Sequence, residues 1–253
     1  MDTADKHIVA IDLGSSKIAL TVAKVNGADI QIIYYKETPS HGIKYSSVVN
    51  VKNVTDSLSM AIREAEEQLG YLSLISGNHD TWRIANYLND DQLRIFYMML
   101  FTLPGIPFVL YGDEIGMKTV HIPSKDGGYQ RTGSRLPMIW NDEEPNHGFT
   151  ETAEPYLPFC KENDTSVEKA MKDHDSLYSY ICHLIMLRSS FPDLVDSHVG
   201  ISEKNRVLTF TRGKYLVIVN LSDKEYEFSG TVIIRSREFT GKLPPQTAVL
   251  VRE

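Results

Sequence analysis

The sequence predicts an α/β fold followed by an all-β region, and three observations support this prediction. Residues 1–70 contain three apolar, β-rich runs and then one amphipathic helix. Residues 71–198 contain two strand–helix units, and polar side chains follow each of the two strands. From residue 199 the pattern changes to short strands separated by turn residues. We therefore expect three domains, over residues 1–70, 71–198 and 199–253.

Composition limits the classes of protein to which the chain can belong. It has 253 residues, 42% of them hydrophobic, which is enough for ordinary buried cores. Its formal net charge of -7 argues against nucleic-acid binding, because nucleic-acid-binding domains normally present a basic face. The two cysteines, Cys160 and Cys182, fit neither a disulfide framework nor a metal-ligand pattern, so we expect free thiols and no metal site. The amino-terminal residues lack a signal-peptide pattern, which predicts a cytoplasmic protein.

The first 70 residues predict a three-stranded sheet and a helix. Strands are expected over residues 7–11, 18–23 and 30–35, with a Gly-Ser-Ser turn between the first two. Thr55 is expected to cap a helix that ends at Gly70, because its apolar residues recur at helical spacing. The apolar face of this helix should dock on the sheet.

The turn between the first two strands, Asp12-Leu13-Gly14-Ser15-Ser16-Lys17, resembles the first phosphate loop of the actin-like ATPase superfamily. Residues 39–43 and the capped helix narrow this resemblance, which covers about residues 6–70, to the bacterial cell-division FtsA family. The resemblance implies contacts with nucleotide phosphates and a hydrated cation at Asp12, Gly14, Ser15, Ser16 and Lys17. With one phosphate loop and no base pocket, ATP and Mg²⁺ are expected to bind weakly at most. The alternative is a plain hairpin turn.

Residues 95–111 form an apolar run of 17 residues that has to be tested as a membrane span. The run is at the short limit for a span, and two prolines break any helix in its last third. We therefore predict no transmembrane segment. Instead, Asp90 and Asp91 should cap a helix over 90–103, and a buried strand should follow over 106–111.

Polar motifs follow both strands of the middle region. A strand over 71–76 leads into Gly77-Asn78-His79-Asp80, and the strand over 106–111 leads into Gly112-Asp113-Glu114. The carboxyl ends of strands are where α/β barrels carry functional residues. Taken alone, the motif has an alternative interpretation, in which His79 only caps a strand and Asp80 only caps a helix. A helix is expected over 175–188, and an antiparallel sheet should follow, with strands over 206–212, 215–220, 225–228, 231–235 and 247–251.

Three segments in this order, 76–83, 103–117 and 134–141, resemble the end of an α-amylase superfamily glycoside hydrolase. The α-glucosidase and oligo-1,6-glucosidase group is most similar, and the resemblance covers residues 73–253. It implies that 71–117 holds strands seven and eight of a TIM barrel. It also implies a long loop, a last barrel helix and a carboxyl-terminal β-sandwich.

The same resemblance implies roles for individual residues. His79 would hydrogen-bond a glucose hydroxyl, and Asp80 would be the transition-state-stabilising carboxylate. Arg83 and Arg135 would line the pocket, whereas Asp113 would be structural, together with Glu114. The implied ligands are α-glucosides or malto- and isomalto-oligosaccharides. Leu136 and Ile139 depart from the threonine and glutamine common in the group.

Hydrolysis needs a nucleophilic carboxylate and an acid/base carboxylate about 5 Å apart. In the family these come from barrel strands four and five, for which this sequence has no counterpart. Our leading interpretation is a truncated α-glucosidase-like hydrolase that retains part of a sugar site without catalysis and is fused to an FtsA-like fragment. Two alternatives stay open: an actin-like module that binds ATP or interacts with division proteins, and a non-functional chimera.

Overall fold

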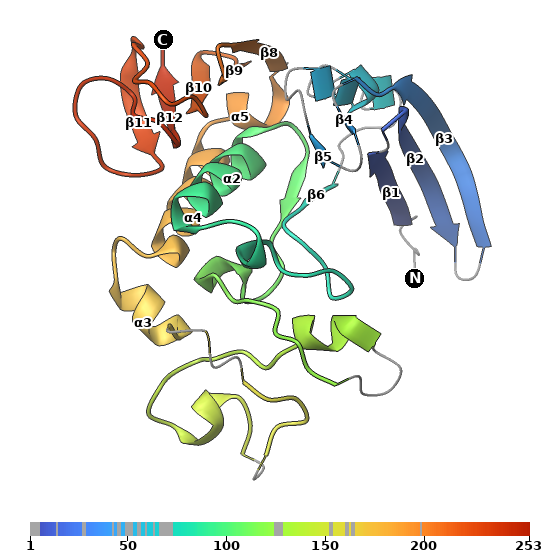
Figure 1. Ribbon diagram of the computed structural model, residues 1–253, viewed down its shortest axis with the longest axis vertical. Coiled ribbons are helices and arrows are strands. Elements are labelled where there is room, and N and C mark those ends of the chain that lie inside the picture. Colours follow the sequence, from blue (N-terminus) through green and yellow to red (C-terminus); the bar gives the residue numbers. More distant parts are fainter. Residues whose placement is uncertain are drawn as a thin grey trace. The chain divides into compact units, whose positions relative to one another are not determined.

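The computed structural model describes residues 6–13, 15–26, 29–41, 43–44, 47–48, 53–54, 57–58, 60–62, 64–65, 73–123, 129–151, 154–159, 162, 165–197 and 199–253. Contacts divide the chain into two compact units (Figure 1). Unit 1 comprises Met1–Ser73 and Ile201–Glu203, and unit 2 comprises Leu74–Gly200 and Lys204–Glu253. The boundaries between the three expected domains stay a prediction.

Unit 1 contains the antiparallel meander that the sequence predicts. Its strands, in sheet order, are β1 (Lys6–Leu13), β2 (Lys17–Asn26) and β3 (Asp29–Pro39). Two short strands, β4 (Ile43–Lys44) and β5 (Ser47–Val48), pair separately. The three long strands extend beyond the predicted runs, because polar residues at their ends continue the pairing. Gly14, Thr55 and Gly70, which were expected to form the turn and the helix ends, lie outside the described residues.

One face of this sheet is covered by helical residues. Residues 57–58, 60–62 and 64–65 are helical, and Ala61 and Ala65 pack against Leu20 and Val22 of β2. This contact confirms the predicted docking of the helix.

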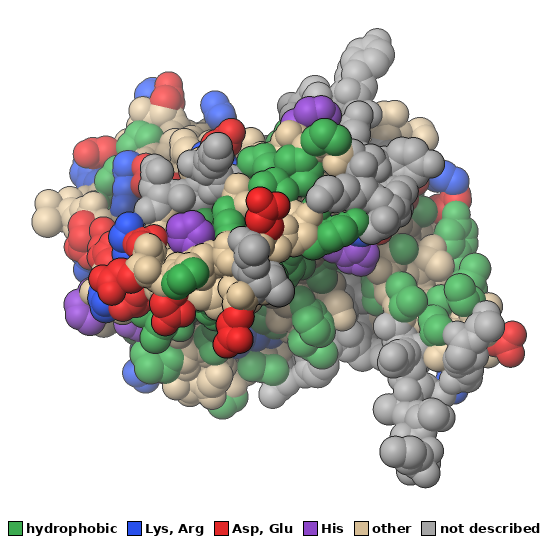
Figure 2. Space-filling view, turned by 90° about the horizontal axis from the view of Figure 1, so that it is seen from below, with side chains coloured by type: hydrophobic (Ala, Val, Ile, Leu, Met, Phe, Trp, Pro, Cys, Tyr) green, Lys and Arg blue, Asp and Glu red, His purple; other side chains and the backbone are tan. Residues whose placement is uncertain are grey.

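The opposite face of the sheet carries other side chains. Ala23 of β2 pairs with residue 8 of β1 and with residue 32 of β3, so the side chains of these three residues point to that face. That face carries exposed apolar side chains, namely Ile8, Ile30, Ile32 and Tyr35. Figure 2 shows hydrophobic side chains at the right of the view, where Figure 1 places β2 and β3.

The first part of unit 2 contains a pair of short strands and the helices around them. The strands are β6 (Ser73–Ile75) and β7 (Ile106–Phe108), and α2 (Asp90–Thr102) connects them. The remaining helices are α3 (Val167–Lys172), α4 (Leu177–Ser190), α5 (Asp193–Asp196), and the 3-10 helices η1 (Ile84–Asn86), η2 (Asp113–Ile115), η3 (Tyr129–Ser134) and η4 (Pro145–Gly148). The predicted helices over 90–103 and 175–188 are confirmed as α2 and α4. Among the described residues, no helix has the length and apolar character that crossing a membrane requires.

Two local expectations for this region are wrong. β7 ends at Phe108 rather than at residue 111, because the Leu110 N–H donates to the Ser76 hydroxyl at 3.0 Å instead of continuing a strand ladder. The cap of α2 is Asn89, not Asp90 with Asp91. Asn89 has extended backbone angles, and it exchanges hydrogen bonds with Gln92 in a reciprocal capping box.

The carboxyl-terminal residues form one five-stranded sheet in the order β11-β12-β10-β9-β8. Its strands are β8 (Val199–Lys204), β9 (Val207–Arg212), β10 (Tyr215–Asn220), β11 (Thr231–Arg235) and β12 (Thr247–Arg252). Residues 225–228 form no strand, and Tyr226 makes only an isolated bridge with Leu243. Over residues 199–253, all of which are described, the predicted antiparallel sheet is confirmed. A second sheet is missing there, so the β-sandwich that the resemblance implied is wrong.

Other elements take the place of that second sheet. On one face of the sheet, Ile218 and Val249 cluster with Leu243 and Tyr226 from the connecting segments. On the opposite face, Val217 pairs with Leu250, and both are fully buried. Helix α2 contacts both β10 and β12. Because both faces are covered, the two central strands are apolar at nearly every position instead of alternating.

Candidate functional site

The turn after β6 presents His79 and Asp80 at the surface. The Asp80 N–H donates to Asn78 Oδ1 at 2.8 Å, which fixes the turn. The Asp80 carboxylate lies 2.7 Å from Arg135 Nη2 and 3.5 Å from His79 Nε2. The side chains of His79, Asp80 and Arg135 are 64%, 42% and 38% exposed. The structure thus gathers three of the four expected sugar-site residues, with their polar ends accessible.

Arg135 reaches Asp80 because a distant loop docks on the segment that follows the turn. The Arg135 Nε also donates to the His79 carbonyl at 3.1 Å. Just before it in the chain, Ser134 donates to the Thr81 carbonyl at 2.7 Å and lies 3.1 Å from the Thr119 hydroxyl. Gly133 permits this approach, since a Cβ at that position would lie 1.7 Å from the Val120 carbonyl oxygen.

Arg83 does not line the site as expected, because its side chain is fully buried. Its Nη1 donates to Asp113 Oδ1 at 2.8 Å and to the Tyr111 carbonyl at 2.6 Å. Its guanidinium carbon lies 4.8 Å from the centre of the Tyr111 ring. Arg83 therefore connects the segment after β6 to the segment after β7 through buried hydrogen bonds. Its side chain has no exposed surface to offer a ligand.

Asp113 and Glu114 have the structural character that the sequence predicts. Asp113 is fully buried, and it accepts a 2.6 Å hydrogen bond from Ser76 besides its ion pair with Arg83. Burial raises the pKa of the Asp113 carboxyl, and the Ser76 and Arg83 hydrogen bonds oppose that rise. Burial likewise raises the pKa of Glu114. The Asp113 carboxylate therefore has no exposed surface to offer a ligand.

The expected nucleotide loop lies in unit 1, at the turn between β1 and β2. Asp12, Ser15 and Ser16 are exposed, and Gly14 lies outside the described residues. The Lys17 ammonium forms an ion pair with Glu37 of β3, across a register in which residue 17 faces Pro39. The amine that was expected to bind phosphate is thus paired with a carboxylate of the same sheet, as in an ordinary hairpin.

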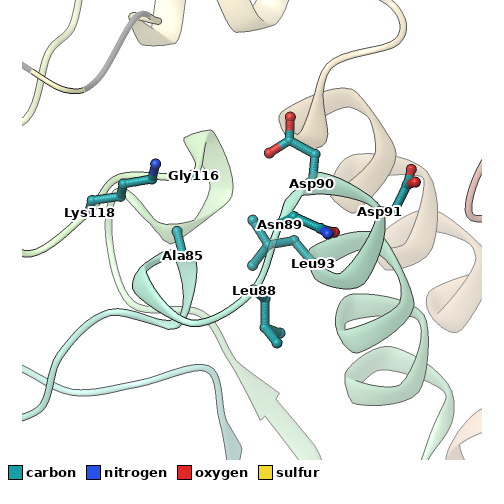
Figure 3. A pocket seen from close by; sticks show the side chains of 8 residues that line it. All are labelled: Ala85, Leu88, Asn89, Asp90, Asp91, Leu93, Gly116 and Lys118. Carbon is teal, nitrogen blue, oxygen red and sulfur yellow. The ribbon is translucent and has the colours of Figure 1, made fainter. Parts of the chain in front are cut away.

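A cavity of about 460 Å³ lies beside the amino terminus of α2 (Figure 3). Its lining residues are Ala85, Leu88, Asn89, Asp90, Asp91, Leu93, Gly116 and Lys118. Figure 3 shows the Asp90 and Asp91 carboxylates on the first turn of the helix. Neither Asp80 nor His79 lines this cavity. We place the candidate site at Asp80 on chemical grounds, because the exposed carboxylate, imidazole and guanidinium converge there.

Sequence reasoning missed the residues that hold the site together. Ser134 bonds to Thr81, 53 residues earlier, and Thr119 bonds to Arg83, 36 residues earlier. The local sequence around Ser134 and Thr119 carries no sign of these contacts.

The two departures from the family pattern have a structural explanation. Leu136 and Ile139 are buried, and Leu136 belongs to an apolar cluster with Met117 and Met138.

The chain is similar to several curated proteins over part of their length. The chain is 29% identical over 211 residues to an oligo-1,6-glucosidase of Bacillus cereus, covering 66% of the chain and 37% of that relative. It is 33% identical over 138 residues to a 4-alpha-glucanotransferase of Thermotoga maritima, covering 51% and 29%. It is 26% identical over 186 residues to the amino acid transporter heavy chain SLC3A1 of Mus musculus, covering 69% and 26%. The chain thus spans well under half the length of these relatives.

Solved structures show the same fold. An isomaltulose synthase from Klebsiella sp. LX3 matches with a TM-score of 0.68 at 20% identity, over 80% of this chain and 46% of that one. None of these matches supports the FtsA-like interpretation of residues 6–70. The α-amylase catalytic-domain family matches residues 25–197, which overlaps that segment. Because this match covers more than half of the sequence, the chain belongs to the α-amylase family.

Proposed function

We propose that unit 2 binds α-glucosidic oligosaccharides through Asp80, His79 and Arg135. The observation that carries the proposal is the exposed Asp80 carboxylate, held between Arg135 and His79 at the end of β6. A carboxylate can accept two short, charge-assisted hydrogen bonds from neighbouring sugar hydroxyls. The guanidinium orients it and can donate its remaining N–H groups to the same ring. The oligo-1,6-glucosidase and 4-alpha-glucanotransferase relatives support malto- or isomalto-oligosaccharides as the ligand class.

We further propose that these 253 residues bind sugar without hydrolysing it. Glycoside hydrolysis with retention uses two carboxylates about 5 Å apart. Of the two aspartates that follow β6 and β7, Asp80 is exposed, while Asp113 is buried against Arg83. This arrangement supports one ligand-binding carboxylate and not an acid/base pair. The chain would then act as a partial sugar site, as the sequence suggests.

Calorimetry and an activity assay on the same purified chain test the proposal. We expect isomaltotriose or maltotriose to bind, and Asp80→Asn to weaken binding by about tenfold, since one charge-assisted interaction is lost. Asp142→Asn is the matched control, because Asp142 is an exposed aspartate that pairs with Lys169. Hydrolysis of an aryl α-glucoside should stay at background. Equal affinity of the Asp80→Asn variant and the unchanged chain would contradict the binding proposal, and turnover that depends on Asp80 would contradict the second one.

The actin-like interpretation of residues 6–70, with ATP or division proteins as partners, stays a separate prediction. The Lys17–Glu37 ion pair favours the hairpin alternative, because it engages the amine that would contact phosphate. We therefore expect Mg²⁺-ATP to bind no better than about millimolar, since a lone loop offsets little of the ordering cost. Micromolar binding by calorimetry, lost in Asp12→Ala, would restore the nucleotide interpretation. The cytoplasmic location also stays a prediction.

A further inference from the structure

Two aromatic rings are exposed immediately after the Asp80 turn. Trp82 is 45% exposed, and Tyr87 is 68% exposed. Their ring centroids lie 6.4 Å apart, and the ring planes are tilted by 37°. Large aromatic side chains dominate the energetics of buried cores and interfaces, so a neighbouring pair left in water is open to a ligand.

The backbone segment between these two rings is fixed by buried side chains and by hydrogen bonds to Thr119. Between them, the side chains of Arg83 and Ala85 are buried. Asn86 donates to the Thr119 carbonyl at 2.8 Å and accepts from the Thr119 N–H at 2.8 Å. The Arg83 N–H donates to the Thr119 hydroxyl at 2.9 Å. The segment therefore has fixed inward anchors and outward aromatic rings, which lowers the entropy that a ligand must offset on binding.

The position of Trp82 along the chain links it to the sugar site. Trp82 follows Asp80 by two residues, so their Cα atoms are at most about 7 Å apart. The Thr81 carbonyl between them is fixed by the Ser134 hydroxyl at 2.7 Å. A pyranose has a rim of hydroxyls, which suit a carboxylate and a guanidinium, and C–H faces, which suit an aromatic ring. The backbone of Trp82 thus lies close to the Asp80 turn, within the length of one or two sugar units.

We propose that Trp82 and Tyr87 form a stacking platform for a second hexose, next to the one held at Asp80. The platform would make the site select disaccharides and longer α-gluco-oligosaccharides over a single glucose unit. This inference rests on the proposed function, because it places the first sugar at Asp80. Trp82→Ala should weaken trisaccharide binding by about tenfold, the cost of removing one well-packed aromatic contact. Binding of methyl α-glucoside should stay within about twofold, since it cannot reach the platform.

The two tryptophans of the chain allow a direct test. Trp140→Phe leaves Trp82 as the single tryptophan. In this variant, maltotriose and isomaltotriose should shift the Trp82 emission to shorter wavelength and protect it from acrylamide quenching. Trp82→Phe should recover most of the affinity lost in Trp82→Ala, because a ring is retained. Tyr87→Ala should also weaken trisaccharide binding, whereas Tyr156→Ala, which removes another exposed ring, should not.

The outcomes separate this inference from the proposed function. Trisaccharide binding that requires Asp80 but leaves Trp82 emission and Trp82→Ala affinity unchanged would overturn the platform and leave the proposed function standing. The absence of any saccharide binding to the folded chain would overturn both. Equal loss of methyl α-glucoside and trisaccharide affinity in Trp82→Ala would also overturn the platform, because it would indicate a disturbed Asp80 turn.

Discussion

Arg83 and Asp80 lie three positions apart in the chain but have opposite environments. Asp80 is exposed, whereas Arg83 is fully buried and ion-paired with Asp113. The Nε and Nη2 atoms of Arg83 are buried without an acceptor among the described residues. Buried donors without acceptors cost free energy, so the pair fixes the geometry beneath the site and is not an optimised stabilising element.

The Arg83–Asp113 pair gives a prediction for stability. Arg83→Met should lower the free energy of unfolding by about 3–5 kcal/mol, because it leaves the Asp113 carboxylate buried without its charged partner. Arg83→Met combined with Asp113→Leu should recover most of that loss, since both buried charges are then gone. Urea unfolding followed by circular dichroism measures both variants. A double variant no more stable than the single one would contradict this account of the pair.

At the residue scale, the sequence identified the exposed residues of the candidate site but did not predict the direction of the buried residues that hold them in place. The motif containing Asn78, His79 and Asp80 pointed to the exposed carboxylate, because a polar group after a strand is a local signal. Arg83 belongs to the same eight-residue segment, yet nothing local distinguishes an arginine that points to a ligand from one that points inward. Its direction is decided by Asp113, 30 residues further along.

At the element scale, the sequence predicted helix α2 correctly but not the residue that caps its amino-terminal end. The apolar run and its breakers correctly predicted a helix followed by a strand, in place of a membrane span. The first residue of the helix was misjudged because Asn89, Asp90 and Asp91 are all suitable caps by residue type. Only the backbone angles and the reciprocal bond from Gln92 decide between them.

Substitution at the start of α2 tests this assignment. Asn89→Ala should lower the free energy of unfolding by about 1 kcal/mol, the usual cost of losing an N-cap. Asp90→Ala should cost less, because a first-turn carboxylate contributes only through the helix dipole. Chemical denaturation of both variants at low salt makes the comparison. A larger effect for Asp90→Ala would support the original expectation that the aspartates cap the helix.

At the scale of the whole molecule, the main error concerns the carboxyl-terminal sheet. The short strands predicted an antiparallel sheet, and the family resemblance implied a sandwich, but the central strands β10 and β12 are apolar on both faces. Continuous apolar runs indicate that both faces are covered without saying by what. Here helix α2, more than 100 residues earlier in the chain, contacts the two strands. Periodicity within a strand cannot reveal a partner so distant in the sequence.

Two arginines strengthen the connection between the helices α2, α4 and α5 and the carboxyl-terminal sheet. Arg188 of α4 donates to the carbonyls of Phe101 and Leu103, at the end of α2, and to that of Leu194 in α5. Arg212 of β9 donates to the same Leu194 carbonyl at 2.9 Å. Both arginines are buried. Helix and loop carbonyls thus share two guanidinium groups, one of them carried by β9, and separating the layers would leave several buried polar groups unpaired.

We therefore expect unit 2 to unfold as one cooperative body, with no separately stable carboxyl-terminal domain. In native-state hydrogen exchange, the amides of α2 and those of β10 and β12 should exchange with the same opening free energy, because α2 covers one face of the sheet. Arg188→Met should lower that free energy equally for the helix and for both strands. If α2 exchanged much faster than β12, or if proteolysis released an intact sheet over residues 199–253, the sheet would be an independent domain, as the sequence pattern alone suggested.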